Sequence, residues 1–185
     1  MKLILLDRDG VINLDDPVGV IRRDQFELIP GSVAAIARLT QAGFKVAVCT
    51  NQSAIGKGWL SEELLGEIHA GLCAEVEKAG GKIDAIYYAP DHPDVPSLRR
   101  KPAPGMLLEA LAEFSAVAAE TYFVGDMLRD MEAALAAGCK RLLVRTGKGA
   151  KLEAAGIPTH VQPVEVVADL SAAVEYILAL TPPNG

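Results

Sequence analysis

Short apolar segments recur along the chain at spacings that suit strands alternating with helices. Residues 3–6 (LILL) form the first segment and 45–50 (KVAVCT) the second, and residues 83–89, 121–124 and 141–144 follow. The segments are mostly apolar throughout and do not alternate between apolar and polar positions. They therefore predict strands buried on both faces, as in a parallel sheet covered by helices.

Helical periodicity fills the intervals between these segments. We expect helices over residues 33–41, 61–80, 106–115, 131–137 and 170–180. Ser61 is a good N-cap, Glu62 and Glu63 suit the first turn that follows it, and Gly138 is a typical C-terminal stop. The alternation predicts an α/β, three-layer, Rossmann-like fold, with a mainly parallel central sheet and helices on both faces.

The chain shows no internal repeat and no long polar linker, so we expect one domain over residues 1–180 and a flexible tail over 181–185. Two irregular stretches, 13–26 and 90–104, are too long for ordinary connections and are candidate functional loops. Ligands of open α/β sheets bind outside the carboxyl ends of the strands. Functional residues are therefore expected directly after the predicted strands.

Composition and charge narrow the class of protein. The 185 residues are 50% hydrophobic with a net charge of −6, which disfavours disorder and a nucleic-acid partner. Cys49, Cys73 and Cys139 are widely spaced and odd in number, which suits a reducing compartment. The apolar run at 3–6 is too short for a signal peptide or a membrane span. We expect a cytoplasmic monomer with a small-molecule substrate and no membrane partner.

Paired carboxylates follow two of the predicted strands. Asp7 and Asp9 come directly after the first strand, and Asp126 and Asp130 follow the fourth. Carboxylates at the end of a buried strand are costly without a cation or hydrogen-bond donors. Turn chemistry explains the first pair taken alone, and an N-cap with a surface residue explains the second. Neither explanation accounts for the occurrence of paired carboxylates after two different strands.

Phosphate-binding groups follow the second and third strands. Thr50-Asn51-Gln52-Ser53 supplies hydroxyl, amide and backbone N–H groups that could cradle a phosphate, although a helix cap or an Asx-turn would also use them. Arg99-Arg100-Lys101 precedes a proline, and Pro102 and Pro104 stiffen this segment. A rigidly held lysine serves as a fixed positive charge. The alternative is that these three basic residues form a solvent-exposed patch without a specific function.

Taken together and in this order, the four motifs are similar to those of the haloacid dehalogenase-like (HAD) phosphohydrolases over residues 3–144. Residues 7–13 (DRDGVIN), 50–53 (TNQS) and 100–102 (RKP) resemble most closely the subgroup that contains D-glycero-D-manno-heptose 1,7-bisphosphate phosphatase and histidinol-phosphate phosphatase. The resemblance implies the HAD fold with a minimal cap, because no interval between the motifs is long enough for a large cap domain.

The resemblance implies a Mg²⁺-dependent phosphomonoesterase that works through an aspartyl-phosphate. Asp7 would be the nucleophile, and Asp9 would first protonate the leaving alkoxide and then deprotonate water. Asp7, the backbone carbonyl of Asp9 and Asp126 would hold the metal. Asp130 would orient either the waters of the metal or Lys101.

The resemblance also assigns a set of residues to the substrate, and Thr50, Asn51 and Lys101 among them would hold the transferring phosphoryl oxygens. The complete set is Thr50, Asn51, Gln52, Ser53, Lys57, Arg100 and Lys101. Lys57 and Arg100 are candidates for a second phosphate, although Lys57 also suits a plain surface loop.

The substrate implied is a heptose bisphosphate that loses its 7-phosphate. Histidinol phosphate or another small sugar phosphate is the alternative. A phosphorylated signalling module of the receiver type is a remote alternative, because receivers place the phosphorylated aspartate after the third strand and Tyr88-Ala89-Pro90 ends that strand here. A non-catalytic binding protein that keeps the fold is the third alternative.

The sequence departs from the heptose-bisphosphate phosphatases in the loop before Arg100. Those proteins carry cysteine and histidine ligands for a structural Zn²⁺ there, whereas no cysteine occurs here between residues 73 and 139. We therefore expect no structural Zn²⁺, and we expect Pro90, Pro93 and Pro96 to hold the shortened 90–99 loop.

Three further features have plain interpretations. We expect His69 on a helix surface and Trp59 in the core or as an anchor for its loop. Residues 147–149 (GKG) lack the spacing of a phosphate-binding P-loop.

Overall fold

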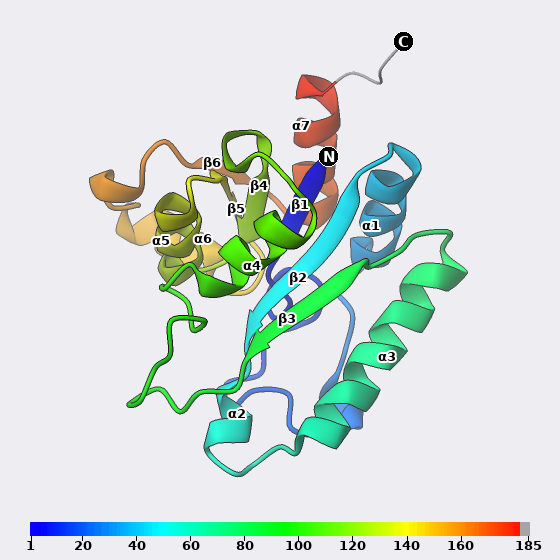
Figure 1. Cartoon of the computed structure of the whole chain (residues 1–185), viewed down its shortest axis with the longest axis vertical. Helices are drawn as coiled ribbons and strands as arrows, with labels where there is room; N and C mark the ends of the chain where they lie inside the picture. The colour runs from blue at the N-terminus through cyan, green and yellow to red at the C-terminus, as the bar shows by residue number, and fades with distance from the viewer. Residues whose placement is uncertain (182–185) are drawn as a thin grey trace.

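A six-stranded parallel sheet forms the centre of the fold in the computed structural model, which describes residues 1–181 (Figure 1). The strands are β1 (Leu3–Leu6), β2 (Lys45–Asn51), β3 (Ala85–Ala89), β4 (Tyr122–Gly125), β5 (Lys140–Val144) and β6 (Glu165–Val167). Their order across the sheet is β3-β2-β1-β4-β5-β6, and every neighbouring pair is parallel. This is the strand order of doubly wound Rossmann-like folds and differs from that of receivers. The predicted fold class is confirmed.

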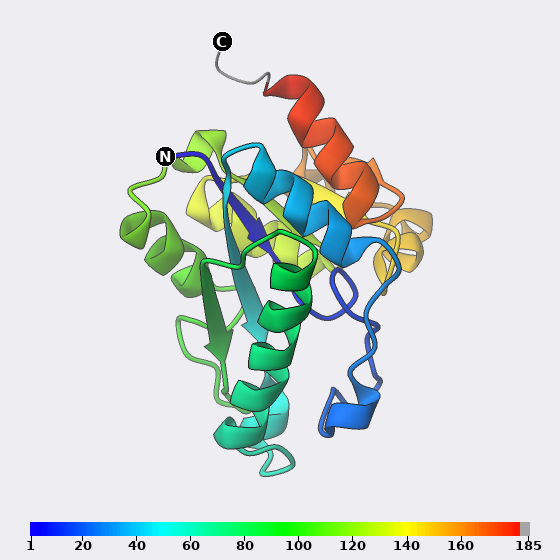
Figure 2. The ribbon, with the colours of Figure 1, turned by 90° about the vertical axis from the view of Figure 1, so that its right-hand side faces the viewer.

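Helices cover both faces of the sheet. The face turned toward the viewer in Figure 2 carries α1 (Ser32–Gln41), α3 (Glu62–Lys78) and α7 (Leu170–Leu180). The opposite face carries α4 (Gly105–Glu113) and α5 (Leu128–Ala137). The short helices are α2 (Ser53–Gly56) and α6 (Gly149–Ala155). Within residues 1–181, no helix combines the length and the apolar character that crossing a bilayer requires.

The first strand shows why its residues are apolar without alternation. Ile4 and Leu6 pack into the cluster beneath α1, α3 and α7, whereas Leu3 and Leu5 pack into the cluster beneath α4 and α5. Successive side chains of a strand point to opposite faces, so a strand covered on both faces needs apolar residues at every position. The strand is thereby anchored, and the residue that follows it, Asp7, has a fixed place.

Several element boundaries differ from those predicted. β6, α2 and α6 were not predicted, because each is short and lacks a sustained apolar pattern. α5 begins at Leu128 and not at residue 131, since its first turn contains Arg129 and Asp130 and shows no apolar periodicity. β3 begins two residues later than predicted. Except for Thr181, the predicted tail lies outside the described residues, and the single domain over 1–180 stays a prediction.

Asp84 ties the start of β3 to β2. Its carboxylate accepts hydrogen bonds from Lys45 Nζ at 2.9 Å and from the Val46 N–H at 3.0 Å, and Lys82 Nζ lies 3.6 Å away. Burial acts to raise the pKa of Asp84, but the bonds from Lys45 and Val46 outweigh it and hold the pKa below its ordinary value. Because the native pKa is the lower one, this carboxylate stabilises the fold above the unfolded-state pKa, and the benefit is lost as the pH falls through the native pKa.

We therefore expect Asp84→Asn to lower the free energy of unfolding by about 1–2 kcal/mol at about pH 7, and by less at about pH 3. Urea unfolding at the two pH values measures the difference. Asp94→Asn serves as the control because the side chain of Asp94 is 85% exposed. If Asp84→Asn lowered the free energy of unfolding equally at both pH values, the charge of Asp84 would not be the source of its stabilising effect.

Candidate active site

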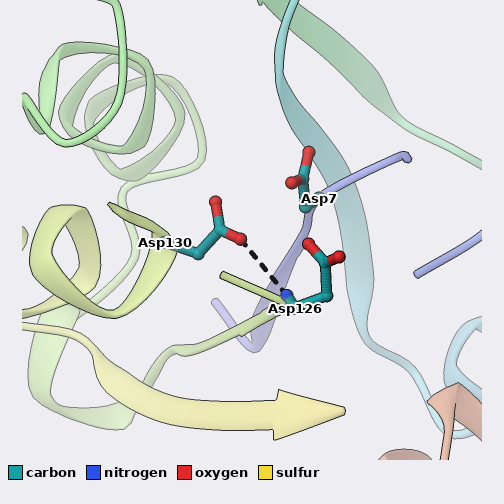
Figure 3. A group of neighbouring side chains, drawn as sticks. All are labelled: Asp7, Asp126 and Asp130. Atoms are coloured by element: carbon teal, nitrogen blue, oxygen red, sulfur yellow. Dashed lines mark hydrogen bonds between the residues drawn. The ribbon is translucent and has the colours of Figure 1, made fainter. Parts of the chain in front are cut away.

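Three aspartates converge where the strand order of the sheet reverses. Asp7 follows β1, Asp126 follows its neighbour β4, and Asp130 lies in the first turn of α5 (Figure 3). All three are buried, and one carboxylate oxygen from each lies within 4.8 Å of the others. The reversal point is where α/β folds of this kind bind ligands. The alternative interpretation of Asp130 as a surface residue is wrong, and Met127, not Asp126, is the N-cap of α5.

Burial and neighbouring charges raise the pKa values of two of these aspartates, Asp7 and Asp126. Burial, and then the neighbouring carboxylates, raise the pKa of Asp126 to about 8. Burial is also the largest cause that raises the pKa of Asp7 to about 6, and the charge of Lys101 partly opposes it. A group of buried carboxylates with raised pKa values is a site where an additional positive charge would be stabilised.

The hydrogen bonds of the cluster leave two oxygens available for a cation. Asp7 Oδ1 accepts a hydrogen bond from the Arg8 N–H at 2.7 Å, and Asp126 Oδ2 accepts one from the Lys148 N–H at 2.8 Å. Within residues 1–181, no donor forms a hydrogen bond to Asp7 Oδ2 or to Asp126 Oδ1. Carboxylate oxygens are the ligands that Mg²⁺ prefers. The residues present therefore fit a Mg²⁺ ion.

Asp130 has a different function in the cluster, because both of its oxygens have protein partners. Oδ2 accepts hydrogen bonds from the N–H groups of Asp126 at 3.2 Å and Met127 at 3.0 Å, and Oδ1 lies 2.7 Å from Lys101 Nζ. Of the two functions predicted for Asp130, the contacts support the orientation of Lys101. The side chain of Asp9 lies outside the group of converging carboxylates, which agrees with a contribution through its backbone only.

Two glycines make room for the carboxylate of Asp126. A Cβ added to Gly10 would lie 2.3 Å from Asp126 Oδ2, and one added to Gly147 would lie 2.2 Å from the same atom. Both glycines have positive φ, and Thr146 Oγ1 donates a hydrogen bond to the Gly10 carbonyl at 2.7 Å. The loop after β5 thus closes over the Asp126 carboxylate. Sequence reasoning missed Gly147, although its place in the loop that follows the fifth strand was a usable signal.

We expect Gly147→Ala to weaken Mg²⁺ binding by about 10–100-fold, because the new methyl group must displace the Asp126 carboxylate. Isothermal titration of the protein with Mg²⁺ measures the effect. Gly43→Ala is the matched control, since Gly43 also has positive φ but a Cβ there would meet no atom within 4 Å. Equal Mg²⁺ affinity in the two variants would contradict the steric argument.

Lys101 lies at the centre of the site, as predicted. Its Nζ is 2.9 Å from Asp7 Oδ1 and 2.7 Å from Asp130 Oδ1, and the side chain is fully buried. Burial acts to lower the pKa of Lys101, but the charges of Asp130 and Asp7 outweigh it and raise the pKa. Lys101 is therefore a permanent positive charge beside Asp7.

Asn51 fixes the backbone of Lys101 and was predicted to contact the phosphoryl group. Its Oδ1 accepts a hydrogen bond from the Lys101 N–H, and its Nδ2 donates one to the Lys101 carbonyl, each at 3.0 Å. This pair of bonds joins the end of β2 to the segment before α4. The amide of the Asn51 side chain thus positions Lys101, and the predicted contact of Asn51 with the phosphoryl group stays a prediction.

The carboxylate of Asp9 is surrounded by donors. Arg8, Asn13 Nδ2 and Gln52 Nε2 all donate hydrogen bonds to it, the latter two at 2.9 Å. Burial acts to raise the pKa of Asp9, but the charge of Arg8 and these bonds outweigh it and lower the pKa. Gln52 Nε2 also donates to Thr50 Oγ1 at 2.9 Å, which leaves the hydroxyl proton of the buried Thr50 free to be donated.

A cavity of about 130 Å³ opens beside Asp9, and its lining carries three acidic side chains, Asp9, Asp15 and Asp16, and three cationic ones. These are Lys57, Arg129 and Lys148, and Asn51, Gln52 and Ser53 also line the cavity. Arg100 does not line it. A larger cavity of about 440 Å³ lies at the amino ends of β4 and β5, away from the carboxylates. Of the cations at the cavity, sequence reasoning found Lys57 and missed the other two.

Two further predictions concern side chains near the cavity. Trp59 is 52% exposed, so it is not a core residue, and Lys57 Nζ lies 4.6 Å from the centre of its ring. Arg100 is half-buried and donates a hydrogen bond to the Asp91 carbonyl at 3.4 Å. Burial and the nearby charge of Arg129 lower the pKa of Arg100. The predicted contact of Arg100 with a second phosphate stays a prediction.

The 90–99 loop is held by side-chain hydrogen bonds. The carboxylate of Asp91 accepts hydrogen bonds from the Ser97 N–H at 3.2 Å and from Ser97 Oγ at 3.0 Å. Gly56 of α2 packs directly on the loop and donates its N–H to the Pro90 carbonyl at 2.8 Å. Hydrogen bonds thus hold this loop, and the predicted contribution of Pro90, Pro93 and Pro96 stays a prediction. The expectation that the protein contains no structural Zn²⁺ stays a prediction.

Comparison with known proteins places the chain in a family. Residues 98–173 match the sequence profile of a family described as HAD-hydrolase-like. A D-glycero-beta-D-manno-heptose-1,7-bisphosphate 7-phosphatase from Neisseria meningitidis serogroup A is 46% identical over 182 residues, which cover 96% of this chain and 95% of that protein. The corresponding protein of Pseudomonas putida is 47% identical over 159 residues, which cover 85% and 90% of the two chains.

A solved structure shares the same fold throughout. The crystal structure of D,D-heptose 1,7-bisphosphate phosphatase from B. bronchiseptica, complexed with magnesium and phosphate, superimposes with a TM-score of 0.93 at 41% identity and covers 98% of this chain and 100% of that chain. These similarities extend over nearly the whole sequence and include the segments that carry the three aspartates. The chain therefore belongs to the HAD-like hydrolases, in the family of the D-glycero-beta-D-manno-heptose-1,7-bisphosphate 7-phosphatases.

Proposed function

We propose that this protein is a Mg²⁺-dependent phosphatase that removes the 7-phosphate of D-glycero-beta-D-manno-heptose 1,7-bisphosphate. The observation that carries the proposal is the buried pair of Asp7 and Asp126 beside the fixed charge of Lys101, where each aspartate has one oxygen that receives no hydrogen bond from the described part of the chain. The names of relatives 46% and 47% identical support the substrate.

In the first step Asp7 attacks phosphorus, the bond to the sugar oxygen breaks, and the phosphoryl group moves to the Asp7 carboxylate. Lys101 contacts Asp7 Oδ1, and its charge there stabilises the negative phosphoryl oxygens as they approach Asp7. A Mg²⁺ ion held by Asp7, Asp126 and the backbone carbonyl of Asp9 would supply the positive charge that lets a carboxylate and a phosphate approach each other. Thr50 can donate its free hydroxyl proton to a phosphoryl oxygen.

Asp9 transfers the protons of both steps. It gives a proton to the sugar oxygen as the ester bond breaks, and it then takes a proton from the water that attacks the aspartyl-phosphate. The hydrogen bonds from Arg8, Asn13 and Gln52 stabilise the carboxylate form, which is the base of the second step. A dianionic phosphate bound nearby raises the pKa of a neighbouring carboxyl group, which favours the acid form for the first step.

The second phosphate of the substrate finds positive charge at the cavity beside Asp9. Lys57, Arg129 and Lys148 line this cavity together with the carboxylates of Asp9, Asp15 and Asp16, and Lys148 Nζ lies 2.7 Å from Asp15 Oδ2. Lys57 and Arg129 are therefore the candidates for contact with a second phosphate. The names of the relatives, and not the charge of the cavity, favour the bisphosphate over histidinol phosphate.

Phosphate release from heptose 1,7-bisphosphate, heptose 7-phosphate and histidinol phosphate tests the proposal, with ³¹P NMR to identify the phosphate that leaves. We expect the highest kcat/KM for the bisphosphate and loss of the 7-phosphate resonance only. Equal and feeble rates on all three esters, or release of the 1-phosphate, would contradict the substrate assignment.

Removal of the metal is expected to stop activity without unfolding the protein. EDTA should abolish phosphate release and Mg²⁺ should restore it, because Asp7 and Asp126 would otherwise repel the phosphate. Circular dichroism should show unchanged secondary structure in EDTA, since no metal is expected to hold the 90–99 loop. Unfolding by the chelator would overturn the zinc-free interpretation.

A further inference from the structure

Arg8 stands between Asp7 and Asp9 in the sequence, and its charged side chain is completely buried. A buried guanidinium group is costly unless it is paired and hydrogen-bonded. Its Nη2 donates to both oxygens of Asp9, at 2.9 and 3.1 Å, and its Nε donates to Asp9 Oδ1 at 3.3 Å. This forked contact fixes the direction of the Asp9 carboxylate, which a single-point contact could not do.

The other end of the Arg8 guanidinium is held by His69 of α3. His69 Nε2 lies 3.1 Å from Arg8 Nη1, and because arginine has only donors, Nε2 must be the acceptor. Burial, and then the charge of Arg8, lower the pKa of His69 to about 4, so the imidazole is neutral near pH 7 and able to accept. His69 is 8% exposed, which corrects the prediction that it lies on a helix surface. The Arg8 guanidinium carbon also lies 5.6 Å from the centre of the Phe26 ring.

These contacts join a helix on one face of the sheet to the proton-transferring side chain at its carboxyl edge. We propose that Arg8, held by His69, is a positioning residue that sets the orientation of the Asp9 carboxylate toward the leaving oxygen. The proposal rests on the proposed function of the site, because it assumes that Asp9 transfers the proton. Neither residue needs to contact the substrate for this role.

Proton transfer depends steeply on the distance and alignment of the donor. In the first step the proton moves from the Asp9 carboxyl group to the ester oxygen while the Asp7–phosphorus bond forms and the ester bond breaks. An ester with a weakly acidic alcohol needs this proton, whereas p-nitrophenolate leaves without it. A misplaced Asp9 should therefore slow the first kind of ester more than the second.

Single-turnover alcohol release from phenyl phosphate and p-nitrophenyl phosphate tests the proposal, because the two esters differ little in shape and strongly in leaving group. For His69→Leu we expect release from phenyl phosphate to fall about tenfold or more, with p-nitrophenyl phosphate nearly unchanged. His69→Gln keeps an acceptor and should restore most of the loss. Arg8→Lys keeps the charge but not the fork, and should also lose activity selectively on phenyl phosphate.

Leu72→Ala is the matched control for packing, since Leu72 is a buried residue of α3 that forms no hydrogen bond to Arg8. It should lower the Tm and leave the ratio of the two rates unchanged. If His69→Leu slows alcohol release from both esters equally, the positioning role is overturned and a structural one remains. If His69→Leu does not fold, the same criterion applies to Arg8→Lys. If the wild-type protein releases alcohol from neither aryl ester and no phosphate from heptose 1,7-bisphosphate, the proposed function itself fails.

Discussion

Replacing Asp7 by Asn is expected to lower phosphate release by at least about 10⁴-fold, because the amide cannot attack phosphorus and no second carboxylate occupies the same place. The fold should survive the change. Burial raises the pKa of Asp7 to about 6. Ionisation of Asp7 therefore lowers the free energy of unfolding as the pH rises toward and above that value. The neutral Asn side chain, which has the same size, removes this loss of stability. Lys101 keeps its partner Asp130.

Phosphate-release assays with Mg²⁺ and thermal unfolding without it measure the two parts of this prediction. The Tm of Asp7→Asn should equal or exceed that of the wild-type protein. Activity within about tenfold of wild type would show that Asp7 is not the nucleophile. A collapse of the Tm would show that the Asp7 carboxylate holds the fold together.

Replacing Lys101 by Met is expected to damage both activity and stability. Phosphate release should fall about 10²–10³-fold, since the charge fixed beside Asp7 is lost. The free energy of unfolding should fall by about 3–5 kcal/mol, because Asp7 and Asp130 are left buried without their cation. Phosphate release and denaturant unfolding measure the two effects.

A double variant separates the two effects of Lys101. In Lys101→Met with Asp130→Asn, the new amide removes one buried charge and keeps an oxygen for the N–H groups of Asp126 and Met127. Stability should recover in part, whereas activity should not. Recovery of activity together with stability would mean that Lys101 matters only because it neutralises Asp130.

The sequence reveals the strands and their terminal carboxylates because both depend on local patterns. β1 is apolar at every position since it is covered on both faces, and the charged Asp7 therefore marks its end without ambiguity. The short β6 has exposed and half-buried residues only, so it carries no apolar run to detect. Pattern thus predicts the centre of the sheet better than its edge.

The partners of the site residues could not be predicted in the same way. Arg8 and His69 are 61 positions apart, and only the packing of α3 on the sheet brings them together. The sequence motif shows that Asn51 is polar and lies at the end of a strand. It does not show that the oxygen and the nitrogen of its amide both form hydrogen bonds with the Lys101 backbone. Residue type identifies the chemistry available, whereas the fold decides which groups remain free for the substrate.

The most direct test of the account is to trap the phosphoryl group on the protein. Asp9→Asn lacks the base of the second step, so with p-nitrophenyl phosphate, which needs no acid in the first step, the aspartyl-phosphate should accumulate. Acid quench and borohydride reduction convert such an acyl phosphate to homoserine, which peptide mass spectrometry can locate. The account predicts homoserine at position 7. Homoserine at another aspartate, or at none while p-nitrophenol is still released in a burst, would contradict it.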